Sequence, residues 1–109
     1  MSQEPTQGLN RFELIATIVE RDVLRYTPAG IPIVAAKLLH SSEQREAGVV
    51  RLIEFEMPAQ AAGEISGRVN QAELGKSFHF SGFLARKHRN SKSLVFHIVE
   101  FEDCSLPNL

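Results

Sequence analysis

Apolar and polar residues alternate along most of this chain with a period of two, which is the period of a β-strand. The first such stretch covers residues 11–19, and the apolar residues of one face are Phe12, Leu14, Ala16 and Ile18. The opposite face, with Ile15, Thr17 and Val19, is too apolar for full exposure to water. We therefore expect a first strand whose outer face forms a dimer interface with a second chain.

A second strand is predicted over residues 33–40, behind a tight turn. Proline stands in the second position of Thr27-Pro28-Ala29-Gly30 and glycine in the last, which is typical of a β-turn. The alternation then places Val34, Ala36 and Leu38 inward and Ala35, Lys37 and Leu39 outward. Residues 41–48 are polar and end in glycine, so we expect a connecting loop there.

The third predicted strand covers residues 49–57, and Pro58 should end it because proline donates no backbone hydrogen bond. Its outward side includes Glu54 and Glu56. Residues 59–72 are rich in Ala, Gly and Gln, which indicates a short helix or a turn-rich link.

Two further strands, over residues 76–85 and 93–102, flank a basic connection at 86–92. If this hairpin is centred on His88, the cross-strand neighbours are Phe80 with Phe96 and Phe78 with Ile98, which make an apolar cluster. Gly82 then lies inward, where the missing side chain lets the strand bend. Five strands with one link after the third predict an all-β, five-stranded OB-fold barrel.

The length of 109 residues fits one domain, and we expect the barrel to occupy residues 10–104, between tails at 1–9 and 105–109. The single cysteine, Cys104, cannot form an internal disulfide, and the first residues show neither a basic start nor an apolar run. A reducing, cytoplasmic location is therefore expected.

The net charge of −1 hides a segregated distribution of charge. Between Leu74 and Val99 there are five Lys or Arg residues and no acid, and four of the five fall in the predicted connection: Arg86, Lys87, Arg89 and Lys92. Cations on a hairpin tip can follow a phosphate backbone. The sequence therefore indicates an anion-binding tip, with chance clustering on a solvated turn as the alternative.

Other candidate contacts to a nucleic acid lie on the outward side of the predicted barrel, because the second and third strands and the hairpin loops of such a barrel commonly form the binding groove. They are Lys37 in the second strand and the aromatic residues Tyr26 and Phe83, which can stack on bases. Local packing is the alternative for both aromatic residues, and a dimer contact is a further one for Phe83.

No arrangement of residues predicts catalysis, a metal site or a cofactor. In the predicted register His79 and His97 face each other, but two ligands do not complete a metal site. The hydroxyls of Ser81 and Ser93 have no nearby acid that could orient a base. Glu54 and Glu56 share a face without a pocket signature, and no glycine-rich phosphate loop is present.

Several short motifs resemble the family of primosomal replication protein N, or PriB, relatives of bacterial single-stranded DNA-binding proteins. They span residues 10–102 and are Asn10-Arg11, Thr17, Thr27-Pro28-Ala29-Gly30-Ile31-Pro32, Leu38, His40, Glu46-Ala47-Gly48, Met57-Pro58, Gly82-Phe83 and His97. The resemblance implies an OB-fold homodimer that binds single-stranded DNA. It also implies a role in assisting the PriA helicase and other primosome proteins during replication restart.

The resemblance further implies DNA contacts by Arg25 and by the basic connection at residues 86–92. The chain departs from the family in its third strand, where Glu54 replaces a stacking aromatic residue and Glu56 shares its face. Carboxylates in a groove repel phosphates. The alternative is therefore an OB-fold adaptor with weak or no DNA binding, which contacts proteins through outward apolar residues: Ile15, Val19, Leu39 and Leu52.

Overall fold

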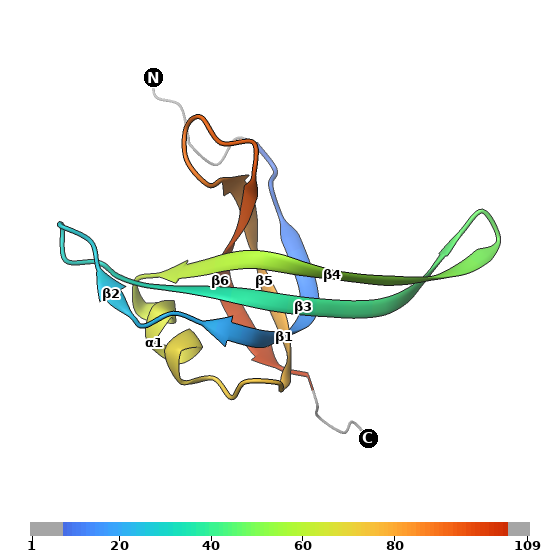
Figure 1. The fold of residues 1–109 in the computed structure, drawn as a ribbon, viewed down its shortest axis with the longest axis horizontal. Helices are drawn as coiled ribbons and strands as arrows, with labels where there is room; N and C mark the ends of the chain where they lie inside the picture. Colours follow the sequence, from blue (N-terminus) through green and yellow to red (C-terminus); the bar gives the residue numbers. More distant parts are fainter. Residues whose placement is uncertain (1–7, 105–109) are drawn as a thin grey trace.

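Five long strands close on one another into a barrel in the computed structural model, which describes residues 8–104 (Figure 1). The long strands are β1 (Phe12–Arg21), β3 (Pro32–Glu46), β4 (Val49–Ala62), β5 (Ser77–Arg86) and β6 (Leu94–Asp103). A two-residue strand, β2 (Arg25–Tyr26), pairs with the start of β3, and one helix, α1 (Glu64–Gln71), follows β4. Of the tails predicted at 1–9 and 105–109, residues 1–7 and 105–109 lie outside the described residues.

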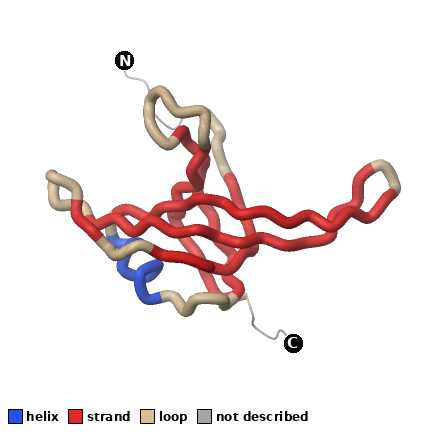
Figure 2. Tube along the Cα trace, in the orientation of Figure 1, coloured by secondary structure: helices blue, strands red, loops and turns tan. Residues whose placement is uncertain are grey.

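The strands follow the order β1-β5-β6-β4-β3, and pairing of β1 with β3 closes the ring. All of these pairings are antiparallel except that of β4 with β6, which joins Ala59 to Phe96 and Gln60 to His97. This topology, with a short helix after the third long strand, confirms the predicted OB-fold barrel. Figure 2 shows α1 beside one end of the strands, and no helix in the described part is long and apolar enough to cross a membrane.

The alternating inward residues fill the barrel, as the sequence predicts. Ile18, Val34 and Leu38 are fully buried, and Phe80 and Phe96 are the largest buried side chains. The residues that complete the core are Ala16, Ala59, Ala61, Val69, Phe78, Ile98 and Phe101. Because Val69 comes from α1, the helix contributes to the same core as the strands.

The predicted loop at residues 41–48 is wrong, because β3 and β4 pair without interruption as far as Glu46 and Val49. Only Ala47 and Gly48 form the turn, and both have positive φ (54° and 79°), which suits a two-residue hairpin. Residues 41–54, called here the β3–β4 arm, extend away from the barrel in Figure 1. The polarity of residues 41–46 reflects the absence of a core beneath them rather than the absence of a strand.

The prediction that Pro58 ends the third strand is also wrong. Pro58 lies opposite Lys37, and β4 continues to Ala62. A strand tolerates proline where the missing N–H would face an unpaired edge. The pairing of β4 with β6 begins only at Ala59, so this edge of β4 is open at Pro58.

The β5–β6 hairpin is centred on Asn90 rather than on His88, so that Leu84 faces Phe96 and Gly82 faces Ile98. Over Gly82–Arg86 the register differs from the predicted one by an even number of residues, so Phe96 and Ile98 still point inward as predicted. A bulge next to Gly82 leaves Val99 without a partner. A Cβ atom on Gly82 would lie 1.8 Å from the His97 carbonyl oxygen, so the bend requires glycine.

Candidate nucleic-acid interface

The end of β5 and the loop that follows it carry four exposed cations, called here the basic tip: Arg86, Lys87, Arg89 and Lys92. The Lys87 amide donates to the Ser93 carbonyl oxygen at 2.9 Å, which closes the loop. Inside it, the Ser91 amide donates to the His88 carbonyl oxygen at 2.9 Å, and the Ser93 amide donates to Ser91 Oγ at 3.0 Å. The backbone of the loop is thus hydrogen-bonded while its long side chains extend into solvent.

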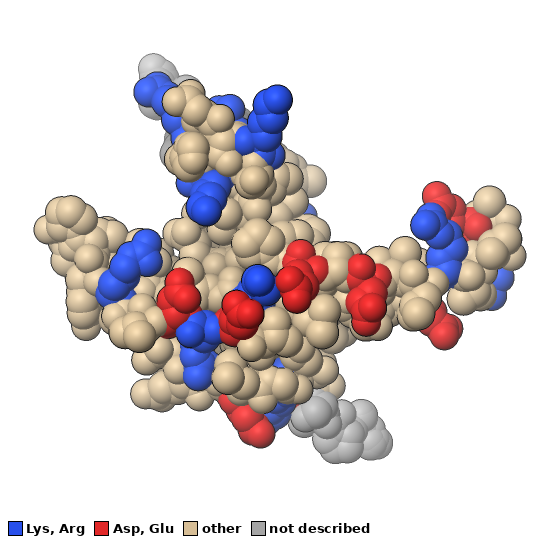
Figure 3. Space-filling view, viewed as in Figure 1, with Lys and Arg blue, Asp and Glu red and all other residues tan. Residues whose placement is uncertain are grey.

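The charges of the basic tip are not compensated. Within residues 8–104, none of its four side chains forms an ion pair, whereas Lys37, Arg51 and Arg68 each pair with a carboxylate. Figure 3 shows only Lys and Arg among the charged residues at the tip, and mixed charges along β3 and β4. The tip is therefore a local positive site on a nearly neutral chain.

Phe83 and His97 face each other on the outer side of β5 and β6, with parallel rings 4.8 Å apart. They line a groove of about 610 Å³ beside α1 that also includes Gln60 and Arg68. Burial disfavours the charged imidazolium and lowers the pKa of His97 below its ordinary value. Since His97 occupies one face of the Phe83 ring, a base could stack only on the other face.

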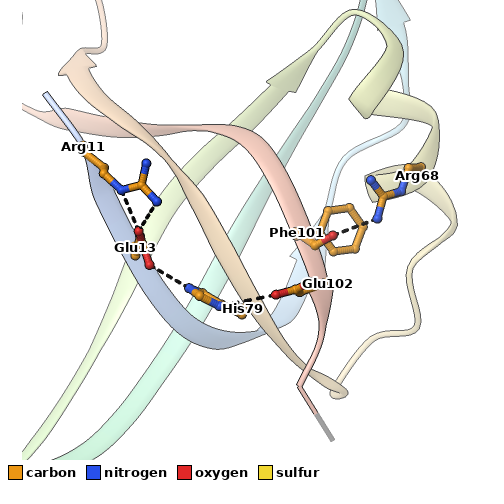
Figure 4. Close-up of polar contacts among 6 residues, drawn as sticks. All are labelled: Arg11, Glu13, Arg68, His79, Phe101 and Glu102. Carbon is orange, nitrogen blue, oxygen red and sulfur yellow. Dashed lines mark hydrogen bonds and ion pairs between the residues drawn. The ribbon is translucent and has the colours of Figure 1, made fainter. Parts of the chain in front are cut away.

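The predicted pairing of His79 with His97 is wrong, because the register places Glu102 opposite His79. Within the described residues no group of three or more His, Cys, Asp or Glu side chains is arranged to hold a metal ion. His79 Nε2 instead donates to Glu13 at 2.9 Å (Figure 4). Glu13 also accepts a hydrogen bond from Arg11, which is the main cause of its lowered pKa, with His79 second.

Arg68 forms a second polar cluster, at the edge of the groove. Its guanidinium donates to the Phe101 carbonyl oxygen at 2.8 Å and lies 4.6 Å from the centre of the Phe101 ring (Figure 4). It also donates to Glu100 at 2.8 Å. The sequence prediction missed this contact, because it joins α1 to a strand more than thirty residues away, and only the pairing of elements reveals it.

Arg25 and Tyr26 lie in β2, next to the predicted turn, and both are exposed. The Gly30 amide donates to the Thr27 carbonyl oxygen at 2.8 Å, which confirms the turn. Figure 1 shows β2 and the β5–β6 loop well apart on the barrel. DNA that contacts both would therefore have to cross the barrel surface between them.

Lys37, a predicted DNA contact, lies between two carboxylates, at 3.7 Å from Glu20 and 3.6 Å from Glu56. Glu54 and Glu56 share its side of the sheet, as predicted, opposite Ser41 and Leu39. We call this side the β3–β4 outer face, and its exposed or half-buried side chains beyond Lys37 are Leu39, Ser41, Glu43, Arg45, Val50, Leu52, Glu54 and Glu56.

The three predicted interface residues of β1 lie on its outward side, where Ile15 is 53% exposed and Val19 37% exposed, and Thr17 is half-buried. The sequence prediction missed an open edge on the same strand. β1 pairs with β5 over Phe12–Thr17 but with β3 only over Thr17–Arg21. Beside this edge, His40 Nδ1 donates to the Ile15 carbonyl oxygen at 2.7 Å.

The sequence model of a group described as another single-strand binding protein family matches residues 10–100. The replication restart protein PriB of Nitrosomonas europaea is 40% identical over 97 residues, which are 87% of this chain and 90% of the relative. The corresponding protein of Bordetella pertussis is 34% identical over 92 residues, 84% of this chain and 86% of the relative.

Solved structures give the same picture. The structure of PriB from Ralstonia solanacearum matches with a TM-score of 0.82 and 44% identity, over 89% of this chain and 99% of that one. The single-stranded DNA-binding protein of Thermus aquaticus matches with a TM-score of 0.69 over 89% of this chain and 50% of that one. Its identity of 21% supports a shared fold.

Proposed function

The chain belongs to the PriB family of replication restart proteins, and from this we propose that it binds single-stranded DNA as an accessory protein of the replication-restart primosome. The observation that carries the proposal is the basic tip, whose four exposed cations lack ion-pair partners within residues 8–104. Such a surface attracts a phosphate backbone and releases its counterions. The function is binding, without a catalytic step or a cofactor.

We assign the phosphate contacts to the basic tip, with Arg25 assisting from β2. Tyr26, which is 67% exposed, and the free side of Phe83 are the stacking positions for bases. Lys37 contributes less than the tip, because Glu20 and Glu56 already compensate its charge. Phosphate and stacking contacts of this kind accept any sequence.

The partner proteins in this proposal are the PriA helicase and other primosome proteins, which act with this chain in the cytoplasm. A second copy of the chain completes the assembly through β1. The exposed Ile15 and Val19 support that interface, as does the open edge of β1 before Thr17. An unpaired strand edge readily pairs with a strand of another chain.

The DNA proposal is tested by fluorescence anisotropy of labelled oligo-dT with the full chain. The double variant Arg89→Ala/Lys92→Ala should weaken binding by about tenfold or more at low salt. The matched control, Arg45→Ala/Arg51→Ala, removes the same charge from the β3–β4 arm and should bind within about threefold of wild type.

Equal binding by wild type and by the tip variant would refute the tip as the DNA site. A loss confined to the arm variant would move the site to the β3–β4 arm. A hairpin loop with exposed side chains should tolerate such changes, and circular dichroism is the check that both variants are folded.

A further inference from the structure

The β3–β4 outer face combines exposed apolar side chains with an excess of acids. Leu52 is 73% exposed and Val50 is 51% exposed. Four carboxylates lie on or beside this face, and the two cations are Lys37 and Arg45. The carboxylates belong to Glu20, Glu43, Glu54 and Glu56.

Cross-strand pairing gives this surface a regular order. Leu39 lies opposite Glu56, and Glu43 lies opposite Leu52, with Ser41 and Glu54 between these two pairs. Each of these three levels therefore offers one carboxylate. Successive levels on one side of a sheet are about 7 Å apart.

The excess negative charge of this face disfavours binding of DNA. Lys37 is already compensated by two carboxylates, and Glu43 and Glu54 have no ion-pair partner within residues 8–104. Unpaired carboxylates repel phosphates, so the face cannot share the role of the basic tip. Figure 1 shows the β3–β4 arm and the β5–β6 loop projecting from the barrel in different directions.

The same features suit a protein partner. A two-stranded hairpin with no layer packed on it is marginally stable in water, and exposed apolar side chains such as Leu52 favour association. We propose that the β3–β4 outer face docks a basic, partly apolar segment of another protein, separately from the DNA-binding tip. In an extended segment, residues on one side recur about every 7 Å and so match the spacing of the carboxylates.

This inference goes beyond the proposed DNA binding, because it assigns a second ligand class to a second surface. It also gives the carboxylates of the third long strand a role. Glu54 would pair with a Lys or Arg of the docked segment, and Leu52 would cover its apolar side chains.

The test is a titration of the ¹⁵N-labelled full chain, followed by NMR. The probe is a synthetic peptide of about ten residues in which two Lys alternate with two Leu, so that each side of the extended peptide carries both residue types. Two further peptides carry Glu in place of Lys, or Lys throughout, and oligo-dT is titrated separately. The Lys-Leu peptide should shift the amide signals of residues 37–43 and 50–56, and oligo-dT those of the basic tip.

Single substitutions test which residues of the outer face bind the peptide. Glu54→Lys should weaken binding of the Lys-Leu peptide by about tenfold, and Leu52→Ser by about threefold. Glu73→Lys, the same charge change at an exposed position between α1 and β5, should leave it within about twofold of wild type. If Glu54→Lys disturbs the fold, Glu43→Lys serves in its place.

Three results would overturn the proposal. If the Lys-Leu and Glu-Leu peptides bound equally well, the face would have no preference for basic segments. If the all-Lys peptide bound as well as the Lys-Leu peptide, the apolar side chains would contribute nothing to binding. Shifts of the outer-face amides by oligo-dT, with tighter DNA binding by Glu54→Lys, would identify the face as a DNA path. Failure of tip variants to affect DNA binding would count against the DNA proposal alone.

Discussion

The side chain of Asn10 is hydrogen-bonded to the backbone of Leu84 in both directions. Asn10 Nδ2 donates to the Leu84 carbonyl oxygen at 2.8 Å, and the Leu84 amide donates to Asn10 Oδ1 at 3.1 Å. The last backbone pair between the same strands is Phe12 with Gly82. The carboxamide therefore acts as one more step of the β1–β5 ladder and holds the hairpin close to the basic tip.

Replacing Asn10 with Ala should destabilise the fold by about 1 kcal/mol, because two partly exposed hydrogen bonds are lost. Urea denaturation measures the change, and hydrogen exchange at the Leu84 amide should become faster. Asn90→Ala, an exposed substitution at the centre of the hairpin, is the control and should have little effect. Unchanged exchange at Leu84 would show that the contact is not formed in solution.

Replacing Gly82 with Ala should cost about 3 kcal/mol or more, because its Cβ would meet the His97 backbone and the bulge would have to rearrange. Thermal unfolding is the measurement. Gly67→Ala is the control, since a Cβ in that helical position meets nothing within 4 Å and Ala favours the helix by about 1 kcal/mol. Equal melting temperatures for the two variants would contradict the close approach at Gly82.

Binding of oligo-dT should weaken with salt in proportion to the phosphates contacted. If the four cations of the basic tip each neutralise one phosphate, log K against log salt should slope by about −3, from about −0.7 per contact. Arg86→Ala should flatten the slope by up to about 0.7 and weaken binding to all sequences alike. A slope that does not change in the tip variants would contradict this assignment.

Stability should fall as the pH drops below 6.5, partly because of His97. Burial lowers the pKa of His97 in the folded protein below its ordinary value of 6.5. Between the two pKa values the unfolded chain binds the proton more readily, so protonation favours unfolding. The stabilisation is complete above 6.5 and is lost as the pH falls through the folded pKa.

The variant His97→Phe can keep a stacked ring opposite Phe83 without a titrating group. Its stability, measured by denaturation across this range of pH, should fall less steeply than that of wild type. Identical slopes for the two proteins would assign the pH dependence to other groups.

The proposed homodimer should depend on the outward side of β1. Ile15→Glu places a charge in the proposed interface and should yield a monomer in light scattering at micromolar concentration. Val23→Glu is the control, because Val23 is 86% exposed and lies outside β1. A wild-type chain that runs as a monomer would contradict the proposed dimer. An Ile15→Glu chain that remains a dimer would show that the interface does not depend on this side of β1.

The inward residues of the barrel could be predicted because burial imposes a strict period on them. Val34 and Leu38 show this pattern, and both are fully buried. In the β5–β6 hairpin the predicted centre was wrong, but the side chains next to the turn were still assigned to the correct sides of the sheet. The observed and predicted registers differ there by an even number of residues, which leaves each side chain on the same side. The bulge at Gly82 could not be predicted, since it depends on how closely the His97 backbone approaches from the neighbouring strand.

The extension of β3 over residues 41–46 could not be predicted for the opposite reason. Residues such as Ser41 and Glu43 have no core beneath them, and burial imposes no pattern on a ribbon exposed on both sides. For the candidate site, the sequence indicated the basic tip from its charge alone. The compensation of Lys37 by Glu20 became visible only when β1 and β3 were paired, because the two residues are distant in sequence.

The parallel contact between β4 and β6 consists of only two residue pairs, Ala59 with Phe96 and Gln60 with His97. On its other side, the β3–β4 hairpin joins β1 through four pairs, from Thr17 to Arg21. The barrel therefore consists of the two-stranded β3–β4 ribbon and the three-stranded β1-β5-β6 sheet, which are joined by two short ladders of backbone pairs. The basic tip belongs to the sheet and the β3–β4 outer face to the ribbon, so the two proposed binding surfaces are joined by these two short backbone ladders and by the shared side-chain core.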